Sequence, residues 1–234
     1  MDVVELLPRL HLLRFPVGQA YLWRDGDDDL TLIDAGPVGS GGALAEAITS
    51  LGLAPGAVRR IVLTHFHEDH AGGAGEWGEV PVLAHRLDAP YVRQERPGPP
   101  PVLQDWERPL HAEVTRGLPP LSEATPPPVA HAVSDGDVLD FGGGARVVHV
   151  PGHTDGSIAL HLPAHGVLFT GDTIAASPVD GTVMPGVFNL DRERALASLR
   201  QLAGLETEVA CFGHGDAVTA GAGAVLREVA DRPA

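Results

Sequence analysis

The sequence contains no lysine, a single cysteine and no long apolar run, and each shortage excludes a class of protein. All 16 basic residues among the 234 are arginines, against 31 acidic residues, so the formal net charge is −15. Nucleic acids and anionic membrane surfaces bind clustered positive charge, so we expect neither as a partner. The lone Cys211 excludes an internal disulfide framework and a cysteine-based zinc finger. No apolar run approaches the roughly 18 residues that a membrane-spanning helix needs.

The first residues also lack the pattern of a secretory signal. They read MDVVELLPRLHLLRFP, with acidic side chains at Asp2 and Glu5 and no basic stretch before the apolar residues. A secretory signal begins with such a basic stretch. We therefore expect a cytoplasmic protein. The remaining composition, 44% hydrophobic and 20% charged, is typical of a globular fold.

Hydrophobic patterns predict strands and helices in both halves of the chain. In the first half they predict a β-hairpin over 21–24 and 30–33, a helix over 43–53, strands over 59–64 and 81–85, and a helix over 87–96. In the second half they predict strands over 138–141, 145–150, 157–162, 167–170 and 209–212, and helices over 191–203 and 224–230. Asp191 is the expected N-cap of the longer helix. The alternation indicates two similar halves, each a sheet covered by helices.

Residues 97–128 differ from the rest of the chain in composition, because 10 of the 21 prolines fall there. Proline lacks a backbone donor and fixes φ, so the two triple-proline runs cannot lie inside a helix or a central strand. Between these runs, residues 102–118 are expected to form one or two short helices that carry Trp106 and His111. Two interpretations stay open: a surface excursion without a role, or a lid whose Trp106 and His111 line a substrate cleft.

The segment Thr64–His70 reads THFHEDH and follows a hydrophobic strand. It holds four potential metal ligands within six residues, namely His65, His67, Asp69 and His70. In an extended backbone, His65 and His67 point to the same side. Imidazole nitrogen and carboxylate oxygen are ligands that zinc and similar divalent ions accept. The segment therefore predicts a metal site rather than a polar loop with incidental histidines.

Three shorter segments place one further potential ligand just after a strand, beside glycine. They are VPGHT with His153, TGDT with Asp172 and FGHG with His214. Glycine permits the sharp turns and close backbone approaches that such a site needs. Each segment is a weak signal alone, but together with the first cluster they favour one metal centre.

In this order and at these spacings, THFHEDH, PGHT, TGD and GHG resemble the metallo-β-lactamase superfamily, over nearly the whole chain. The resemblance implies one domain over 1–234 with an α+β fold, an αββα sandwich in which two mixed sheets are flanked by helices. Residues 97–128 would be a Pro-rich, lid-like insertion in this domain. The resemblance also implies a site at one edge of the fold for two Zn²⁺ ions, with iron or manganese as alternatives.

The resemblance further implies a role for each matching residue. Two trios would each bind one metal: His65, His67 and His153, and Asp69, His70 and His214. Asp172 would bridge the two metals, and Asp34, in LIDAG, would orient the ligands. Asp69 and Asp172 would be the catalytic residues. The implied reaction is hydrolysis of a small-molecule thioester, ester or lactone by a hydroxide held between two metals, which needs no serine or cysteine nucleophile.

Departures from named branches of the superfamily narrow the expected substrate. True β-lactamases carry cysteine or serine where this chain has Asp172, and the branch that opens acyl-homoserine lactones uses a tyrosine that residues 173–188 lack. Nuclease branches need a basic surface. The glyoxalase II branch carries a glutathione-binding helical domain after the last ligand, whereas this chain ends shortly after His214. We therefore expect a compact hydrolase similar to glyoxalase II but without that domain.

Two alternatives to the hydrolase stay open. One is a non-haem iron oxygenase of the persulfide dioxygenase type, in which two histidines and an aspartate hold a single iron. The other is a metal-binding protein without catalytic activity. The retention of seven potential ligands favours the two-metal hydrolase over the oxygenase.

Overall fold

The computed structural model describes residues 1–127 and 130–232, which divide into two compact units. The first unit comprises residues 1–98 and 112–133, and the second comprises 99–111 and 134–234. Each unit has its own sheet, in agreement with the two halves predicted from the sequence. Residue 128, the last of the predicted Pro-rich insertion, lies outside the described residues.

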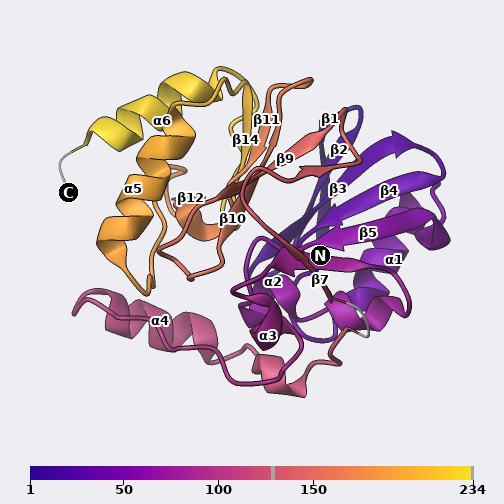
Figure 1. The fold of residues 1–234 in the computed structure, drawn as a ribbon, viewed down its shortest axis with the longest axis horizontal. Helices are drawn as coiled ribbons and strands as arrows, with labels where there is room; N and C mark the ends of the chain where they lie inside the picture. Colours follow the sequence, from indigo (N-terminus) through magenta and orange to yellow (C-terminus); the bar gives the residue numbers. More distant parts are fainter. Residues whose placement is uncertain (128–129, 233–234) are drawn as a thin grey trace. The chain divides into compact units, whose positions relative to one another are not determined.

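The first unit is built around a mixed sheet whose strands follow one another in sequence order (Figure 1). They are β1 Asp2–Leu7, β2 Leu10–Arg14, β3 Gln19–Gly26, β4 Asp29–Ile33, β5 Val58–Val62, β6 Val82–His85 and β7 Ala130–Val133. Strands β1 to β4 pair antiparallel, whereas β4 to β7 pair parallel. The predicted hairpin is therefore confirmed as β3 and β4, in which Tyr21 lies opposite Ile33.

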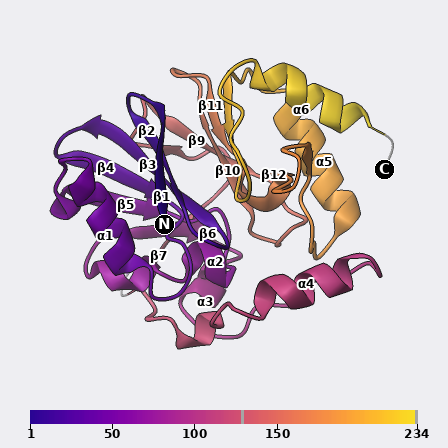
Figure 2. The same ribbon diagram turned by 180° about the vertical axis from the view of Figure 1, so that it is seen from behind.

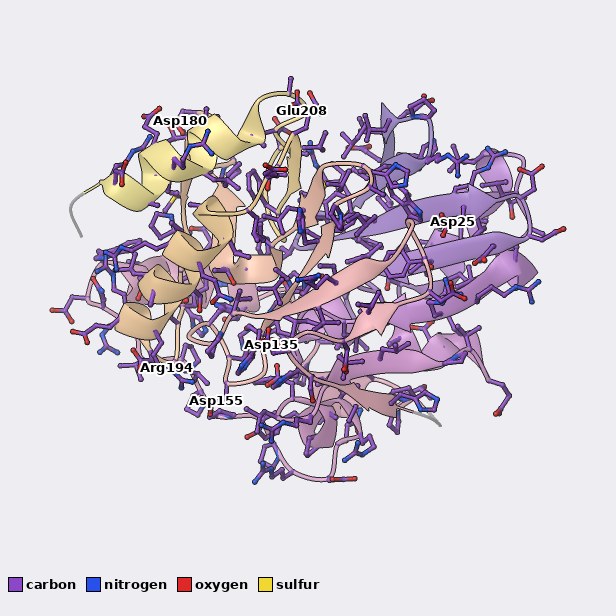
Figure 3. The ribbon with its side chains drawn as sticks, turned by 45° about the horizontal axis from the view of Figure 1, so that its top comes forward. Asp25, Asp135, Asp155, Asp180, Arg194 and Glu208 are labelled. Carbon is purple, nitrogen blue, oxygen red and sulfur yellow. The ribbon has the colours of Figure 1, made fainter. Side chains whose placement is uncertain are left out.

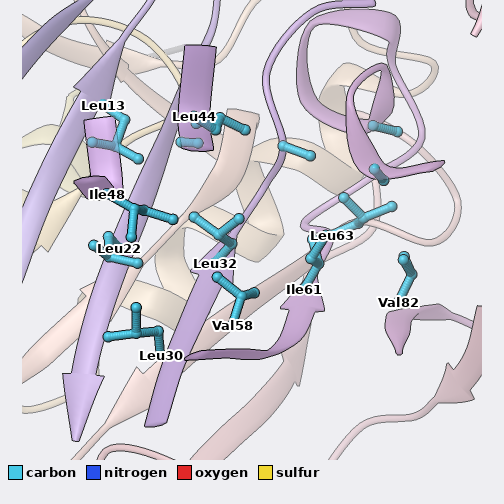
Figure 4. Packing of buried hydrophobic residues seen from close by; sticks show 14 of the residues in the cluster. Leu13, Leu22, Leu30, Leu32, Leu44, Ile48, Val58, Ile61, Leu63 and Val82 are labelled. Carbon is cyan, nitrogen blue, oxygen red and sulfur yellow. The ribbon is translucent and has the colours of Figure 1, made fainter. Parts of the chain in front are cut away.

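Helix α1 (Gly41–Ser50) covers one face of this sheet, as Figure 4 shows. Its buried residues, Gly41, Leu44, Ala47 and Ile48, recur at helical spacing and form one apolar face. They pack against leucines of the strands, among them Leu22 and Leu32, which are fully buried. The predicted helix over 43–53 is thus confirmed, and Gly52, whose φ of 75° is left-handed, follows its end.

The remaining helices of the first unit are single turns. They are α2 Glu68–Ala71 and α3 Ala89–Val92, and the 3₁₀ turns η1 Pro55–Ala57, η2 Ala74–Trp77 and η3 Leu121–Glu123. The helix predicted over 87–96 was wrong in length, since α3 alone is helical there. Gln94 adopts a left-handed φ of 56°, and its side-chain amide donates to the carbonyl oxygens of Leu121 and Ala124. Tertiary hydrogen bonds therefore override the local helical pattern.

The second unit contains a sheet with the order β14-β11-β10-β9-β8 and a separate ribbon of β12 and β13. The bounds are β8 Val138–Leu139, β9 Ala145–His149, β10 Ile158–Leu162, β11 Val167–Phe169, β12 Ile174–Ala176, β13 Val183–Pro185 and β14 Val209–Cys211. Neighbours β9, β10 and β11 alternate in direction, and β11 and β14 are parallel. Strands β9, β11 and β14 consequently run the same way, and their carboxyl ends share one edge.

Helices α5 (Arg192–Ala203) and α6 (Ala222–Asp231) lie side by side in the second unit (Figures 1 and 2). Leu199 and Leu202 of α5 and Leu226 of α6 share a buried core with Phe212. The predicted cap of α5 is confirmed, because the Asp191 carboxylate accepts a hydrogen bond from the Arg194 backbone N–H at 3.0 Å.

Helix α4 (Glu107–Thr115) confirms a short helix within residues 102–118. Its first residues belong to the second unit and its last to the first. The turn η4 (Gly171–Thr173) links β11 to β12. No helix among the described residues is both long and apolar enough to cross a membrane.

Candidate metal centre

In the first unit, the parallel strands β4 and β5 bring the predicted ligands to one sheet edge. Asp34 directly follows β4, and the segment from Thr64 to His70 follows its neighbour β5. Carboxyl ends of parallel neighbours meet at the same edge, which is where ligands bind in such sheets. Helix α2 begins after His67, so one helical turn folds Asp69 and His70 back towards this edge. We call His65, His67, Asp69 and His70 the first cluster.

A single buried carboxylate, that of Asp34, organises the first cluster. It accepts hydrogen bonds from the Thr64 backbone N–H at 2.7 Å and from the Thr64 hydroxyl at 2.8 Å. It also lies 2.9 Å from Nδ1 of His70. The Thr64 oxygen in turn lies 3.1 Å from Nδ1 of His65. Asp34 thereby controls two imidazoles, one directly and one through a hydroxyl group.

These contacts fix the tautomers of His65 and His70. A carboxylate accepts only, so Nδ1 of His70 carries the proton. The one hydrogen of the Thr64 hydroxyl is donated to Asp34, so the hydroxyl oxygen accepts from a protonated Nδ1 of His65. In the neutral form of both rings Nε2 therefore presents its lone pair, which is the form that binds a metal.

Nε2 of His70 lies 3.6 Å from a carboxylate oxygen of Asp69, and Nε2 of His65 lies 3.1 Å from Nδ1 of His67. His65 and His70 are fully shielded from solvent, or nearly so. A lone pair and a carboxylate oxygen this close repel one another in a buried setting, and a shared divalent cation relieves that repulsion.

The second unit repeats this arrangement with strands that run in one direction. His153 follows β9, Asp172 lies in the turn after β11, and His214 follows β14. The backbone N–H of Gly213 donates to the carbonyl oxygen of Gly171 at 3.0 Å, which joins the two loops that carry Asp172 and His214. We call His153, Asp172 and His214 the second cluster.

Asp172 is the centre of the second cluster. One of its carboxylate oxygens lies 3.6 Å from Nε2 of His153 and 3.1 Å from Nε2 of His214. Nδ1 of His153 lies 3.1 Å from the carbonyl oxygen of Val187, which can only accept, so in the neutral imidazole Nε2 of His153 carries the lone pair. The side chain of His153 is 2% exposed, whereas that of His214 is 34% exposed, so the cluster opens towards solvent on the side of His214.

The donor sets of both clusters fit a divalent metal ion. Each combines imidazole nitrogens and carboxylate oxygens, the ligands preferred by zinc and chemically similar ions. In each cluster a backbone or side-chain acceptor fixes a histidine so that its other nitrogen faces a carboxylate. Ligands of metal sites are typically oriented in this way.

The two predicted lid residues, Trp106 and His111, have different surroundings. Trp106 is 54% exposed, and its indole N–H donates to the side chain of Gln104 at 2.9 Å. His111 packs edge-on against Phe188, with 5.0 Å between the ring centroids. His111 thus contacts the loop that holds the Val187 carbonyl, and the lining of a substrate cleft by Trp106 stays a prediction.

Two other features of the second unit lie close in sequence to the second cluster. Figure 3 shows Arg194 near Asp155, and their ion pair of 3.0 Å connects α5 to the loop just after His153. Cys211 is buried, and burial raises the pKa of its thiol, which stays protonated and unreactive.

Thr64 and Val187, which orient the candidate ligands, were not predicted from the sequence. Thr64 directly precedes His65, the first predicted ligand, and this position was the available signal. Val187 acts through its backbone carbonyl, which any residue type supplies. The residue type at this position therefore could not reveal its role.

Comparison with known proteins identifies the family of the chain. A model of the metallo-beta-lactamase superfamily matches residues 13–214. The chain belongs to this superfamily. Among its curated relatives, the probable metallo-hydrolase YqjP of Bacillus subtilis is 26% identical over 88% of this chain and 70% of its own length. The probable metallo-hydrolase YflN of the same organism is 32% identical over 80% of this chain and 76% of its own length.

A hydroxyacylglutathione hydrolase of Gloeobacter violaceus is 34% identical over 71% of this chain, but this match spans only 52% of the relative. A metallo-beta-lactamase family protein of Thermus thermophilus has a solved structure that superposes with a TM-score of 0.70, at 27% identity, over 97% of this chain and 78% of its own. The predicted fold class, the α+β sandwich of this superfamily, is confirmed.

Proposed function

We propose that the protein is a hydrolase of small thioesters, esters or lactones that works with two divalent metal ions, zinc in the first instance. The first and second clusters would together form its metal centre. His65, His67 and His153 would bind one ion, Asp69, His70 and His214 would bind the other, and Asp172 would contact both.

One observation carries this proposal: in each cluster a histidine is fixed so that its lone pair faces a carboxylate. This holds for His70 beside Asp69 and for His153 beside Asp172, both at 3.6 Å. A purely structural pair would place an N–H against the carboxylate instead. The relatives named as metallo-hydrolases and hydroxyacylglutathione hydrolase support the same reaction class.

Bound divalent ions would supply a water molecule that ionises near neutral pH and would polarise the substrate carbonyl. The residues of the chain supply orientation and charge. Asp34 and Thr64 hold two imidazoles as neutral ligands, so the positive charge at the centre stays on the metals. The buried carboxylate of Asp69, beside Nε2 of His70, would accept a proton from the attacking water.

A hydrolysis screen tests this proposal. Wild-type protein and Asp172→Ala are assayed on a thioester, an ester and a lactone, before and after dialysis against a chelator, and again after zinc is added back. We expect wild-type hydrolysis of at least one substrate, loss on chelation and recovery with zinc, and no activity in the variant. Equal inactivity of both proteins on every substrate would remove the enzyme proposal.

The metal found in protein purified without added metal separates the hydrolase from the oxygenase. Iron at one ion per chain, with oxygen consumption on a persulfide, would replace the hydrolase with the mononuclear oxygenase. Metal binding without turnover of any substrate would leave a metal-binding protein.

A further inference from the structure

The Pro-rich insertion contributes one buried carboxylate, that of Glu107 at the start of α4. Its side chain is 4% exposed, although the residues on either side of it are exposed. One oxygen accepts from the backbone N–H of Gln104 at 2.8 Å, as in an N-terminal capping arrangement. The other oxygen accepts from the backbone N–H of Phe188 at 3.0 Å. All three residues belong to the second unit.

The Phe188 N–H belongs to the same peptide group as the carbonyl of Val187. That carbonyl accepts the Nδ1 proton of His153 at 3.1 Å. A continuous series of hydrogen bonds therefore runs from Glu107 through one peptide group to the imidazole of His153. A charged acceptor on the N–H side polarises the peptide, which strengthens the carbonyl as an acceptor. A stronger bond at Nδ1 makes Nε2 of His153 a better metal ligand.

The loop that carries this peptide packs closely against the second cluster. A Cβ atom on Gly186 would lie 1.7 Å from the carbonyl oxygen of Asp172, so only glycine fits there. The Leu190 N–H donates to the carbonyl oxygen of His153 at 3.2 Å. A shift of residues 186–190 would consequently move both Asp172 and His153.

The insertion holds the other side of this loop. The Val102 N–H donates to the carbonyl oxygen of Asn189 at 3.0 Å, and the His111 ring packs on Phe188. Phe188 has a φ of 58°, a left-handed conformation that a bulky residue rarely adopts unless its surroundings impose it. Its bond to Glu107 is one of the contacts that impose it.

We propose that Glu107 is a positioning residue for His153, which it fixes as a metal ligand through the peptide group between Val187 and Phe188. This inference rests on the proposed function of His153. It gives the Pro-rich insertion a role in the metal centre that differs from closing over a substrate.

The test compares Glu107→Gln with the matched control Glu113→Gln, an exposed carboxylate of the same helix. Glutamine keeps the size of the side chain, but it has one acceptor oxygen for the two N–H groups. The first readout is the ¹⁵N NMR signal of the His153 ring in metal-free protein, which reports the tautomer. The second is zinc affinity, measured by competition with a chromophoric chelator.

We expect Glu107→Gln to convert the single Nδ1–H tautomer of His153 into a mixture and to weaken zinc binding about tenfold. Glu113→Gln should change neither. A lower melting temperature with an unchanged tautomer and unchanged zinc affinity would show that Glu107 is only structural, and would overturn the inference. If the wild type bound no zinc, the proposed function would fail, while the NMR comparison would still decide whether Glu107 positions His153.

Discussion

The first and second clusters hold similar candidate ligands, but they orient them by different means. In the first cluster the carboxylate of Asp34 and the hydroxyl of Thr64 fix the imidazoles through side chains. In the second cluster a backbone carbonyl, that of Val187, fixes His153. Side-chain orientation depends on the residue type at one position, whereas backbone orientation depends on the conformation of a whole loop.

This difference determines which substitutions should disturb each cluster. A single substitution at Asp34 should disturb two ligands of the first cluster at once. In the second cluster no substitution at Val187 removes the carbonyl, so the ligands themselves and the contacts of residues 186–190 are the sensitive points.

The largest effect is expected at Asp172, which faces two imidazoles of the second cluster. Asp172→Asn replaces a charged oxygen with a neutral amide and should lower hydrolysis by at least about 100-fold and reduce bound metal. Steady-state kinetics and metal analysis measure both. The control is Asp231→Asn, an exposed carboxylate of the same unit. Activity in Asp172→Asn equal to that of this control would contradict a catalytic role for the second cluster.

Asp34→Asn should give the next largest effect, in the first cluster. Asparagine tolerates the left-handed φ of 60° at this position, but it keeps only one of the two carboxylate oxygens. Either the Thr64 backbone N–H, which Oδ1 accepts, or the Thr64 hydroxyl and His70 Nδ1, which share Oδ2, then lose their acceptor. We expect zinc affinity to fall about 10- to 100-fold and the free energy of unfolding to fall by about 1–3 kcal/mol. Chelator competition and urea denaturation measure these, with exposed Asp28→Asn as the control. Unchanged zinc affinity would show that Asp34 does not organise the ligands.

Thr64→Val should have a smaller effect, because it breaks only the link from Asp34 to His65. The change removes the hydroxyl but keeps the shape, so we expect a loss of about 1–2 kcal/mol in the free energy of unfolding and a weaker zinc affinity than wild type. Thr64→Ser keeps the hydroxyl and should resemble the wild type in both measurements. If serine and valine behaved alike, the hydroxyl would not be the link.

The smallest effect concerns His11, a buried imidazole of the first unit outside the cluster. Burial lowers its pKa from the ordinary value of 6.5, Glu5 opposes this shift and Arg24 adds to it. The unfolded chain therefore binds more protons as the pH falls through 6.5, and the free energy of unfolding decreases. Urea denaturation at pH 7.5 and 5.5 should show a smaller decrease for His11→Phe than for the wild type. An equal decrease would assign the pH dependence to other groups.

The two clusters also differ in how far sequence could predict them. The first is nearly continuous in the chain, so the pattern after β5 indicated a metal site from residue types alone. The second is assembled from three separate loops, and each motif became informative only beside the others. Glu107 could not be predicted, because its role depends on the backbone N–H of Phe188, far away in the sequence.

How well each element of the fold could be predicted likewise depends on whether its contacts are local or distant in the sequence. Elements with a clear period, such as β3, β4, α1 and α5, were predicted to within a few residues. The helix expected over 87–96 is a single turn because Gln94 bonds to a distant segment. Strands β1, β2, β7, β12 and β13 were not predicted, since short strands depend on pairing partners rather than on their own pattern.

The proposed metal centre combines both clusters and holds two metal ions. Its most direct test is the amount of metal per chain in protein purified without added metal, measured by inductively coupled plasma mass spectrometry and repeated on Asp34→Asn and Asp172→Asn. We predict about two divalent ions per wild-type chain, mainly zinc, and a loss of metal in both variants. Wild-type protein without bound metal, or variants that keep the full wild-type content, would contradict the claim.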